Sequence, residues 1–170
     1  VIAFVLVTLI IFLFLGNIKS VIVPAVALPV SLIGTFIGLT IFDLSINIFV
    51  LLSFILAIGI ITDDSVIMTD AIYQKIEGGE TPLVASWLGA KSITAPIIST
   101  TLVLVASFAP LIFLSGISGT LFRETAIALS FAIVVSSFVA LTLSPALAAN
   151  FLTKNMKKSH MKLSKSIYSP

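Results

Sequence analysis

Two adjacent carboxyl groups, Asp63 and Asp64, stand in the middle of an otherwise apolar stretch, LLSFILAIGIITDDSVIMTDAI. If this stretch crosses a membrane, each central aspartate costs about 2.5 to 3.5 kcal/mol to insert, so the pair must face protein, water or a cation. A carboxyl group in that setting tends to hold its proton, and two close carboxylates bind protons as one coupled unit. These residue types at this spacing therefore predict a proton-carrying site.

The surroundings of the pair leave several roles open. Thr62 and Ser65 flank the aspartates, and their hydroxyl groups either bond the carboxylates or water, or bond back to helix carbonyls. Asp70, near the predicted end of the span, is better explained as an interfacial residue. No other predicted span has a basic residue near its middle. We therefore expect the counter-charge, Lys or Arg, from another polypeptide or from a transmembrane half missing from this chain.

The composition requires a membrane environment. The chain has 170 residues, of which 59% are hydrophobic and 9% are charged, whereas a soluble domain carries about 25% charged residues. Because about 20 apolar residues cross a bilayer, we predict an all-α transmembrane bundle over residues 1–152, followed by a basic cytoplasmic tail at 153–170. The five predicted spans lie near 1–15, 21–42, 46–70, 92–114 and 125–152. The first is short, so we interpret it as a span cut at its start. A signal peptide is the alternative, although no basic segment precedes it and no small-residue cleavage site follows it.

The charges between the spans predict an orientation. Six lysines in or after the first, third and fifth connections compare with one basic residue, Arg123, on the other side. Because positive charge marks the cytoplasmic side, these three connections are predicted to be cytoplasmic. In the third, Thr81 and Pro82 predict the start of a short interfacial helix at 82–90, which places Trp87 at headgroup depth.

Two glycines in the second predicted span, Gly34 and Gly38, are four residues apart and lie on one helix face. Such spacing lets a neighbouring backbone approach closely. We interpret them as a helix-packing surface.

Other functions are excluded by residue type. The net charge is only +2, and most basic residues lie in the tail, so nucleic acid is not an expected partner. The chain has no cysteine and a single histidine, His160, so we predict no metal site. An intramembrane aspartyl protease needs carboxylates on two facing helices, and the predicted spans offer one helix only.

Four segments together resemble the resistance-nodulation-division superfamily, specifically its hydrophobe and amphiphile efflux pumps of Gram-negative bacteria. FLGNIKSVIVPAVALPVSLIGTF resembles the junction of the second and third spans, and FDLSINIFVLLSFILAIGIITDDSVIMTDAI resembles the fourth span. SFAPLIFLSGISGTLFRE and LTLSPALAANFL resemble the fifth and sixth spans. The five predicted spans thus correspond to spans two to six of such a transporter.

The resemblance implies a drug/proton antiporter of the bacterial inner membrane and no cofactor beyond the proton-motive force. It implies a homotrimer joined to a periplasmic adaptor and an outer-membrane channel, with Asp63 and Asp64 at the proton-relay positions. The chain departs from the family pattern V-E-N, with Thr69-Asp70-Ala71 after the relay helix. It also lacks the large periplasmic domains and the second transmembrane half. A protein-translocation accessory of the same superfamily, or a non-functional remnant of a split transporter gene, is therefore an alternative.

Overall fold

Four long helices make up the bundle in this computed structural model. The structure describes residues 8–9, 12–13, 18–41, 43–44 and 46–152. Each of the four helices contains a segment long and apolar enough to cross a membrane, and no strand occurs among the described residues. The helices are α2 (Ile18–Ile41), α3 (Ile48–Glu77), α4 (Pro82–Ile112) and α5 (Ile117–Phe151).

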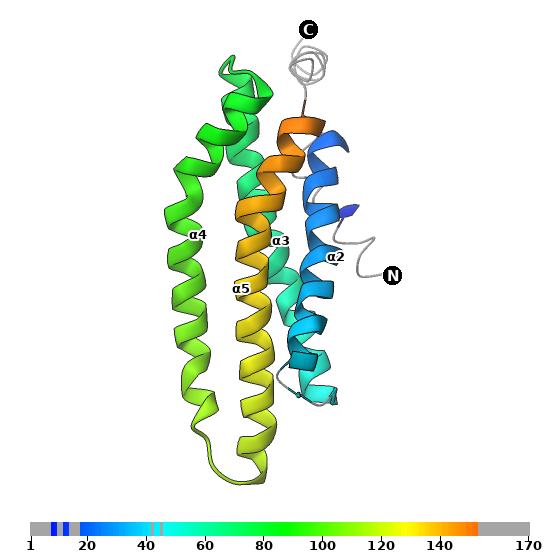
Figure 1. Cartoon of the computed structure of the whole chain (residues 1–170), viewed down its shortest axis with the longest axis vertical. Coiled ribbons are helices and arrows are strands. Elements are labelled where there is room, and N and C mark those ends of the chain that lie inside the picture. The colour runs from blue at the N-terminus through cyan, green and yellow to red at the C-terminus, as the bar shows by residue number, and fades with distance from the viewer. Residues whose placement is uncertain (1–7, 10–11, 14–17, 42, 45, 153–170) are drawn as a thin grey trace, which may run out of the picture.

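The helices alternate in direction along the bundle (Figure 1). The start of α2, the turn between α3 and α4 and the end of α5 lie at one end, which we call the basic end because Lys75 lies there in the last turn of α3. The opposite end holds the connections before α3 and before α5. Helices α3 and α5 each contact the other three helices, so these two helices form the centre of the bundle.

Three predicted spans correspond to observed helices, with different ends. The span predicted at 21–42 is α2, the one at 46–70 is the first part of α3, and the one at 125–152 is the larger part of α5. Helix α3 continues to Glu77 because no helix-breaking residue occurs until Gly78 and Gly79, the second of which has a φ of 106°. Hydropathy marks how much of a helix is apolar, not where its hydrogen bonding stops.

Where the sequence predicted a short interfacial helix at 82–90 and a span at 92–114, the structure has one continuous helix from Pro82 to Ile112. Only Lys91 interrupts the apolar pattern there, and lysine is a good helix former whose long side chain reaches toward water from an apolar surface. The first turns of α4 lean relative to the remainder (Figure 1). The helix contains Pro96 and Pro110, and a proline inside a helix removes one hydrogen bond and favours a bend.

Five spans are not confirmed, since the described residues contain four helices able to cross a membrane. The predicted first span near 1–15 falls outside the described residues except at 8–9 and 12–13, and the predicted basic tail at 153–170 falls outside them entirely.

The two glycines of α2 meet α5. A Cβ atom added to Gly34 would lie 2.8 Å from Val135 Cγ1, and one added to Gly38 would overlap the ring of Phe131. Because Phe131 and Val135 are themselves four residues apart, side chains of α5 fill the hollows that the glycines leave on α2.

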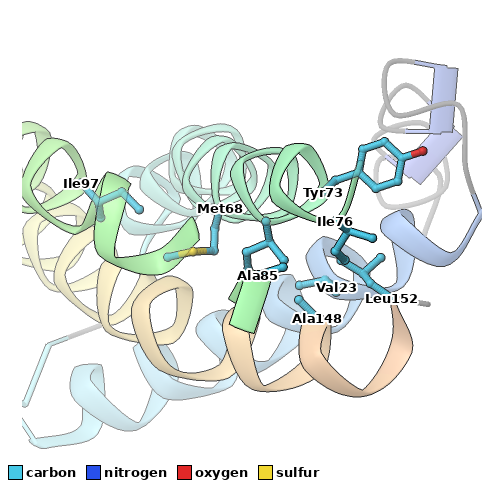
Figure 2. Close-up of a cluster of buried hydrophobic side chains, with 9 residues drawn as sticks. Val23, Met68, Tyr73, Ile76, Ala85, Ile97, Ala148 and Leu152 are labelled. Atoms are coloured by element: carbon cyan, nitrogen blue, oxygen red, sulfur yellow. The ribbon is translucent and has the colours of Figure 1, made fainter. Parts of the chain in front are cut away.

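Two apolar clusters form most of the core. The cluster at the basic end takes residues from all four helices, and Figure 2 shows its side chains converging between the ribbons. Its members include Val23, Met68, Ile97 and Ala148. The second cluster lies farther from this end and includes Ile61 and Ile133. Asp64 lies between Ile61 of the second cluster and Met68 of the first.

Candidate functional site

Asp64 interrupts the apolar core near the middle of the 30-residue helix α3. Only 9% of its surface is exposed. Ile61, one turn before it, belongs to one apolar cluster, and Met68, one turn after it, belongs to the other. The carboxyl group therefore lies between two dry layers, where a polar group needs a hydrogen-bond partner.

That partner is a serine of α5. The Ser137 hydroxyl donates to Asp64 Oδ2 at 3.3 Å, and it also lies 3.1 Å from the carbonyl oxygen of Ile133. The first distance exceeds the usual range of about 2.5 to 3.0 Å for an O–H···O bond. Ser137 thus contacts the carboxylate loosely and has a second acceptor within reach on its own helix.

A threonine of α4 extends this contact to a third helix. Thr101 Oγ1 and Ser137 Oγ are hydrogen-bonded, and Thr101 Oγ1 also lies 2.7 Å from the carbonyl oxygen of Ile97, a second acceptor for its proton. Asp64, Ser137 and Thr101, which we call the three-helix polar chain, therefore connect α3, α5 and α4 at one level of the bundle.

Asp63 faces a different environment. It is exposed on the surface of the bundle, because neighbouring residues of a helix point about 100° apart. No hydrogen bond or ion pair to Asp63 occurs among the described residues. An ionised side chain inside a membrane span is costly if lipid surrounds it.

The structure shows no hydrogen bond from Thr62 or Ser65, the two predicted neighbours, to either aspartate. The Thr62 hydroxyl donates to the carbonyl oxygen of Ile58 at 2.6 Å, within its own helix. The Ser65 hydroxyl is buried and has no hydrogen-bond partner among the described residues. The same is true of Ser136, beside Ser137 on α5. Ser65 and Ser136 therefore each lie one residue from the polar chain, with a hydroxyl group that bonds to no described residue. The role of Ser65 in the proton relay stays a prediction.

Ser137 and Thr101 were not predicted from the sequence. A signal was present, since both belong to hydroxyl pairs, Ser136-Ser137 and Thr100-Thr101, inside long apolar runs. Such residues are common in membrane helices and often bond only to their own backbone, as Thr100 does here with Pro96 and Ile97. Only the packing of the helices shows which hydroxyl of each pair meets Asp64.

The opposite end of the bundle has its own polar contact between α3 and α5. Asn47 Oδ1 accepts hydrogen bonds from the backbone of Phe49 and Val50 at 3.0 and 2.9 Å, which caps the start of α3. Its Nδ2 donates to Glu124 Oε2 at 2.6 Å. This contact holds the two helices in register below the polar chain.

Comparison with known proteins identifies the family. The sequence profile of the AcrB/AcrD/AcrF family matches residues 1–168. The chain belongs to this family. An uncharacterized transporter of Haemophilus influenzae is 40% identical over 156 residues, which cover 92% of the chain and 15% of that protein. This AcrB/AcrD/AcrF chain thus spans a small part of the length of its relative. The family belongs to the resistance-nodulation-division superfamily, and the relative is named as a transporter. The four apolar helices suit a multi-pass membrane protein.

Proposed function

We propose that this chain is the proton-carrying part of a proton-driven multidrug exporter, with Asp63 and Asp64 as the groups that take up and release protons. The observation that carries the proposal is the position of Asp64, buried at mid-helix and bonded through Ser137 to a third helix. Buried ionisable groups inside membrane helices are costly and are retained for function.

The directions of the hydrogen bonds in the three-helix polar chain depend on whether Asp64 is protonated. This dependence supports a link between the protonation of Asp64 and the contacts between the helices. An ionised Asp64 only accepts, so the single Ser137 proton points to it, and the Thr101 proton is free to point to Ser137 Oγ. A protonated Asp64 can donate to Ser137, whose own proton then turns to Thr101 or to the Ile133 carbonyl. Taking up a proton therefore reorients the bonds between α5 and α4.

Asp63 supplies the second half of the proposal. Its exposed position suits a basic side chain from the transmembrane half that this chain lacks, and such a cation favours the ionised carboxylate. Proton uptake would then weaken the contact between the two halves. A conformational change that depends on protonation is what antiport requires.

The remaining parts of the proposal concern the whole protein. We place it in the bacterial inner membrane as a homotrimer that works with a periplasmic adaptor and an outer-membrane channel. Drugs are captured by domains outside this chain. The proton-motive force supplies the energy, without a cofactor.

Substitution of each aspartate separately tests the function. We expect Asp63→Asn and Asp64→Asn, in the full-length protein, to reduce drug transport driven by an imposed proton gradient in proteoliposomes to background. Asn keeps the size and polarity of the side chain but binds no proton.

Asp70→Asn is the matched control. Asp70 lies on the same helix, is exposed and accepts a hydrogen bond from Gln74 at 2.8 Å, so its variant should transport normally. Insertion and thermal stability of all three variants are measured in parallel to separate lost coupling from misfolding. Transport at the wild-type rate in both Asp63→Asn and Asp64→Asn would contradict the proposal.

A further inference from the structure

A groove of about 910 Å³ lies between the first half of α4 and the last part of α5, near the basic end. It is within the size range of small-molecule sites, about 300 to 1,000 Å³. One stripe of α4, from Leu83 to Ile98, forms one wall, and Leu141 and Pro145 of α5 are in the other. Most of its lining is apolar, and it belongs neither to the polar chain nor to the aspartate pair.

The groove has a structural cause. A Cβ atom on Gly89 would lie 2.8 Å from Ile72 Cα, so α4 is in close backbone contact with α3 at this level. Toward α5, by contrast, the facing residues are small, among them Ala90, Ala95 and Ala146. Helix α4 is thus held against α3 and leaves a hollow on its α5 side.

Two polar groups in this apolar groove have no protein partner. Ser86 is only 4% exposed, and its hydroxyl has no hydrogen bond to any described residue. Lys91 lines the same groove, and no described acidic side chain forms an ion pair with it. The side chains of a helix lean toward its N-terminus, so the Lys91 ammonium group extends along α4 toward the level of Ser86.

Trp87, between these two residues, has 70% of its surface exposed and also lines the groove. Tryptophan is preferred where hydrocarbon meets lipid headgroups. The part of the groove nearer the basic end is therefore interfacial and offers a cation, a hydroxyl and an indole. The other part is apolar and extends to Ile98.

We propose that this groove binds one anionic phospholipid. Its phosphate contacts the Lys91 ammonium group, a headgroup or ester oxygen accepts a hydrogen bond from Ser86, and an acyl chain lies between Ile98 and Leu141. A lipid satisfies both unpartnered polar groups and fills the apolar hollow with one molecule, and anionic headgroups are attracted to basic residues at the membrane surface. This site goes beyond proton coupling and does not depend on it.

Native mass spectrometry of the full-length protein tests the proposal with phosphatidylglycerol and phosphatidylethanolamine of identical acyl chains. We expect Lys91→Gln to weaken phosphatidylglycerol binding about fivefold, the effect of one surface charge on an anionic lipid, and to leave phosphatidylethanolamine binding unchanged. Lys91→Arg keeps the charge and should restore the preference. Lys75→Gln is the matched control, because Lys75 is exposed at the same end but does not line the groove.

A second measurement tests whether lipid reaches the groove. Lipids with brominated acyl chains should quench Trp87 fluorescence, taken as the difference between the protein and its Trp87→Phe variant. Equal effects of Lys91→Gln and Lys75→Gln would overturn the site, because general surface charge then explains the binding. Absence of quenching at Trp87 would also overturn it and would show that another part of the protein covers the groove.

Discussion

Asp63 and Asp64 are neighbours in the sequence, yet the fold separates their surroundings. Asp64 contacts a hydroxyl group of α5, whereas Asp63 is exposed and forms no hydrogen bond with a described residue. Successive helix positions diverge by about 100°, so the two carboxylates point in different directions. The pair therefore suits a site between two groups of helices, one on each side of α3, better than a site enclosed in a single bundle.

Thr101 tests whether the three-helix polar chain holds α4 to α5. Thr101→Val keeps the shape of the side chain and removes its hydroxyl group. We expect a loss of about 0.6 kcal/mol, with an upper limit near 1.7 kcal/mol, in the free energy of unfolding, as for hydrogen bonds between membrane helices. The measurement is an SDS titration of the full-length protein.

Thr100→Val is the matched control for this prediction, because the Thr100 hydroxyl bonds only to Pro96 and Ile97 of its own helix. In a double-mutant cycle, Thr101→Val and Ser137→Ala should be non-additive, since each removes the same contact. Additive losses would mean that the two hydroxyl groups do not stabilise the bundle jointly.

The aspartate pair could be predicted from the sequence, whereas its hydroxyl partners could not. A carboxylate inside an apolar run is anomalous whatever surrounds it, so Asp63 and Asp64 stand out without a fold. A serine or threonine there is ordinary, and its importance depends on which helix face it occupies. Ser137 and Thr101 acquire a role only from the packing of α5 against α3 and α4.

Among the helices, α4 is the least enclosed. Its buried residues, Ala85, Ser86, Gly89 and Ile97, all lie in its first two-thirds. The contact of Gly89 with α3 therefore fixes the position of a helix that is otherwise mostly exposed. The same contact produces the groove on the α5 side.

A methyl group at Gly89 should loosen this attachment. In Gly89→Ala the new Cβ atom would lie 2.8 Å from Ile72 Cα and 2.9 Å from Ile72 N, and backbone atoms cannot rotate away. We expect a loss of about 1 to 3 kcal/mol in the free energy of unfolding, the usual cost of overpacking. The SDS titration used for Thr101→Val measures it.

Gly59→Ala is the control, because nothing lies within 4 Å of a Cβ atom at this helical position. Alanine is a better helix former than glycine by about 1 kcal/mol, so Gly59→Ala should be neutral or stabilising. An equal loss in both variants would show that close contact with Ile72 is not what makes Gly89 sensitive.

The helices themselves could be predicted better than their ends. Apolar length located the cores of α2, α3 and α5, because a helix that crosses hydrocarbon must be apolar. It missed the continuity of α4 through Lys91 and the extension of α3 to Glu77. Both features depend on backbone hydrogen bonds continuing beyond the apolar region, which hydropathy does not measure.

The bundle as a whole has two chemically different ends. Lys75 and Lys91 lie toward the end with the α3–α4 turn, and Arg123 and Glu124 lie in the first turns of α5 at the other. Because the helices alternate in direction, one orientation in the membrane fixes the side on which every connection lies. The same orientation decides which leaflet of the membrane the proposed lipid groove faces.

Cysteine labelling measures that orientation. The chain has no native cysteine, so Gly79→Cys and Ser115→Cys, each in a full-length protein freed of other cysteines, introduce single thiols into exposed connections at opposite ends. We expect a membrane-impermeant maleimide to label Gly79→Cys only in inside-out vesicles and Ser115→Cys only in right-side-out vesicles, because positive charge is retained on the cytoplasmic side. The reverse pattern would contradict the predicted topology and would move the Lys91 groove to the outer leaflet. Labelling of both positions from the same side would mean that α4 does not cross the membrane.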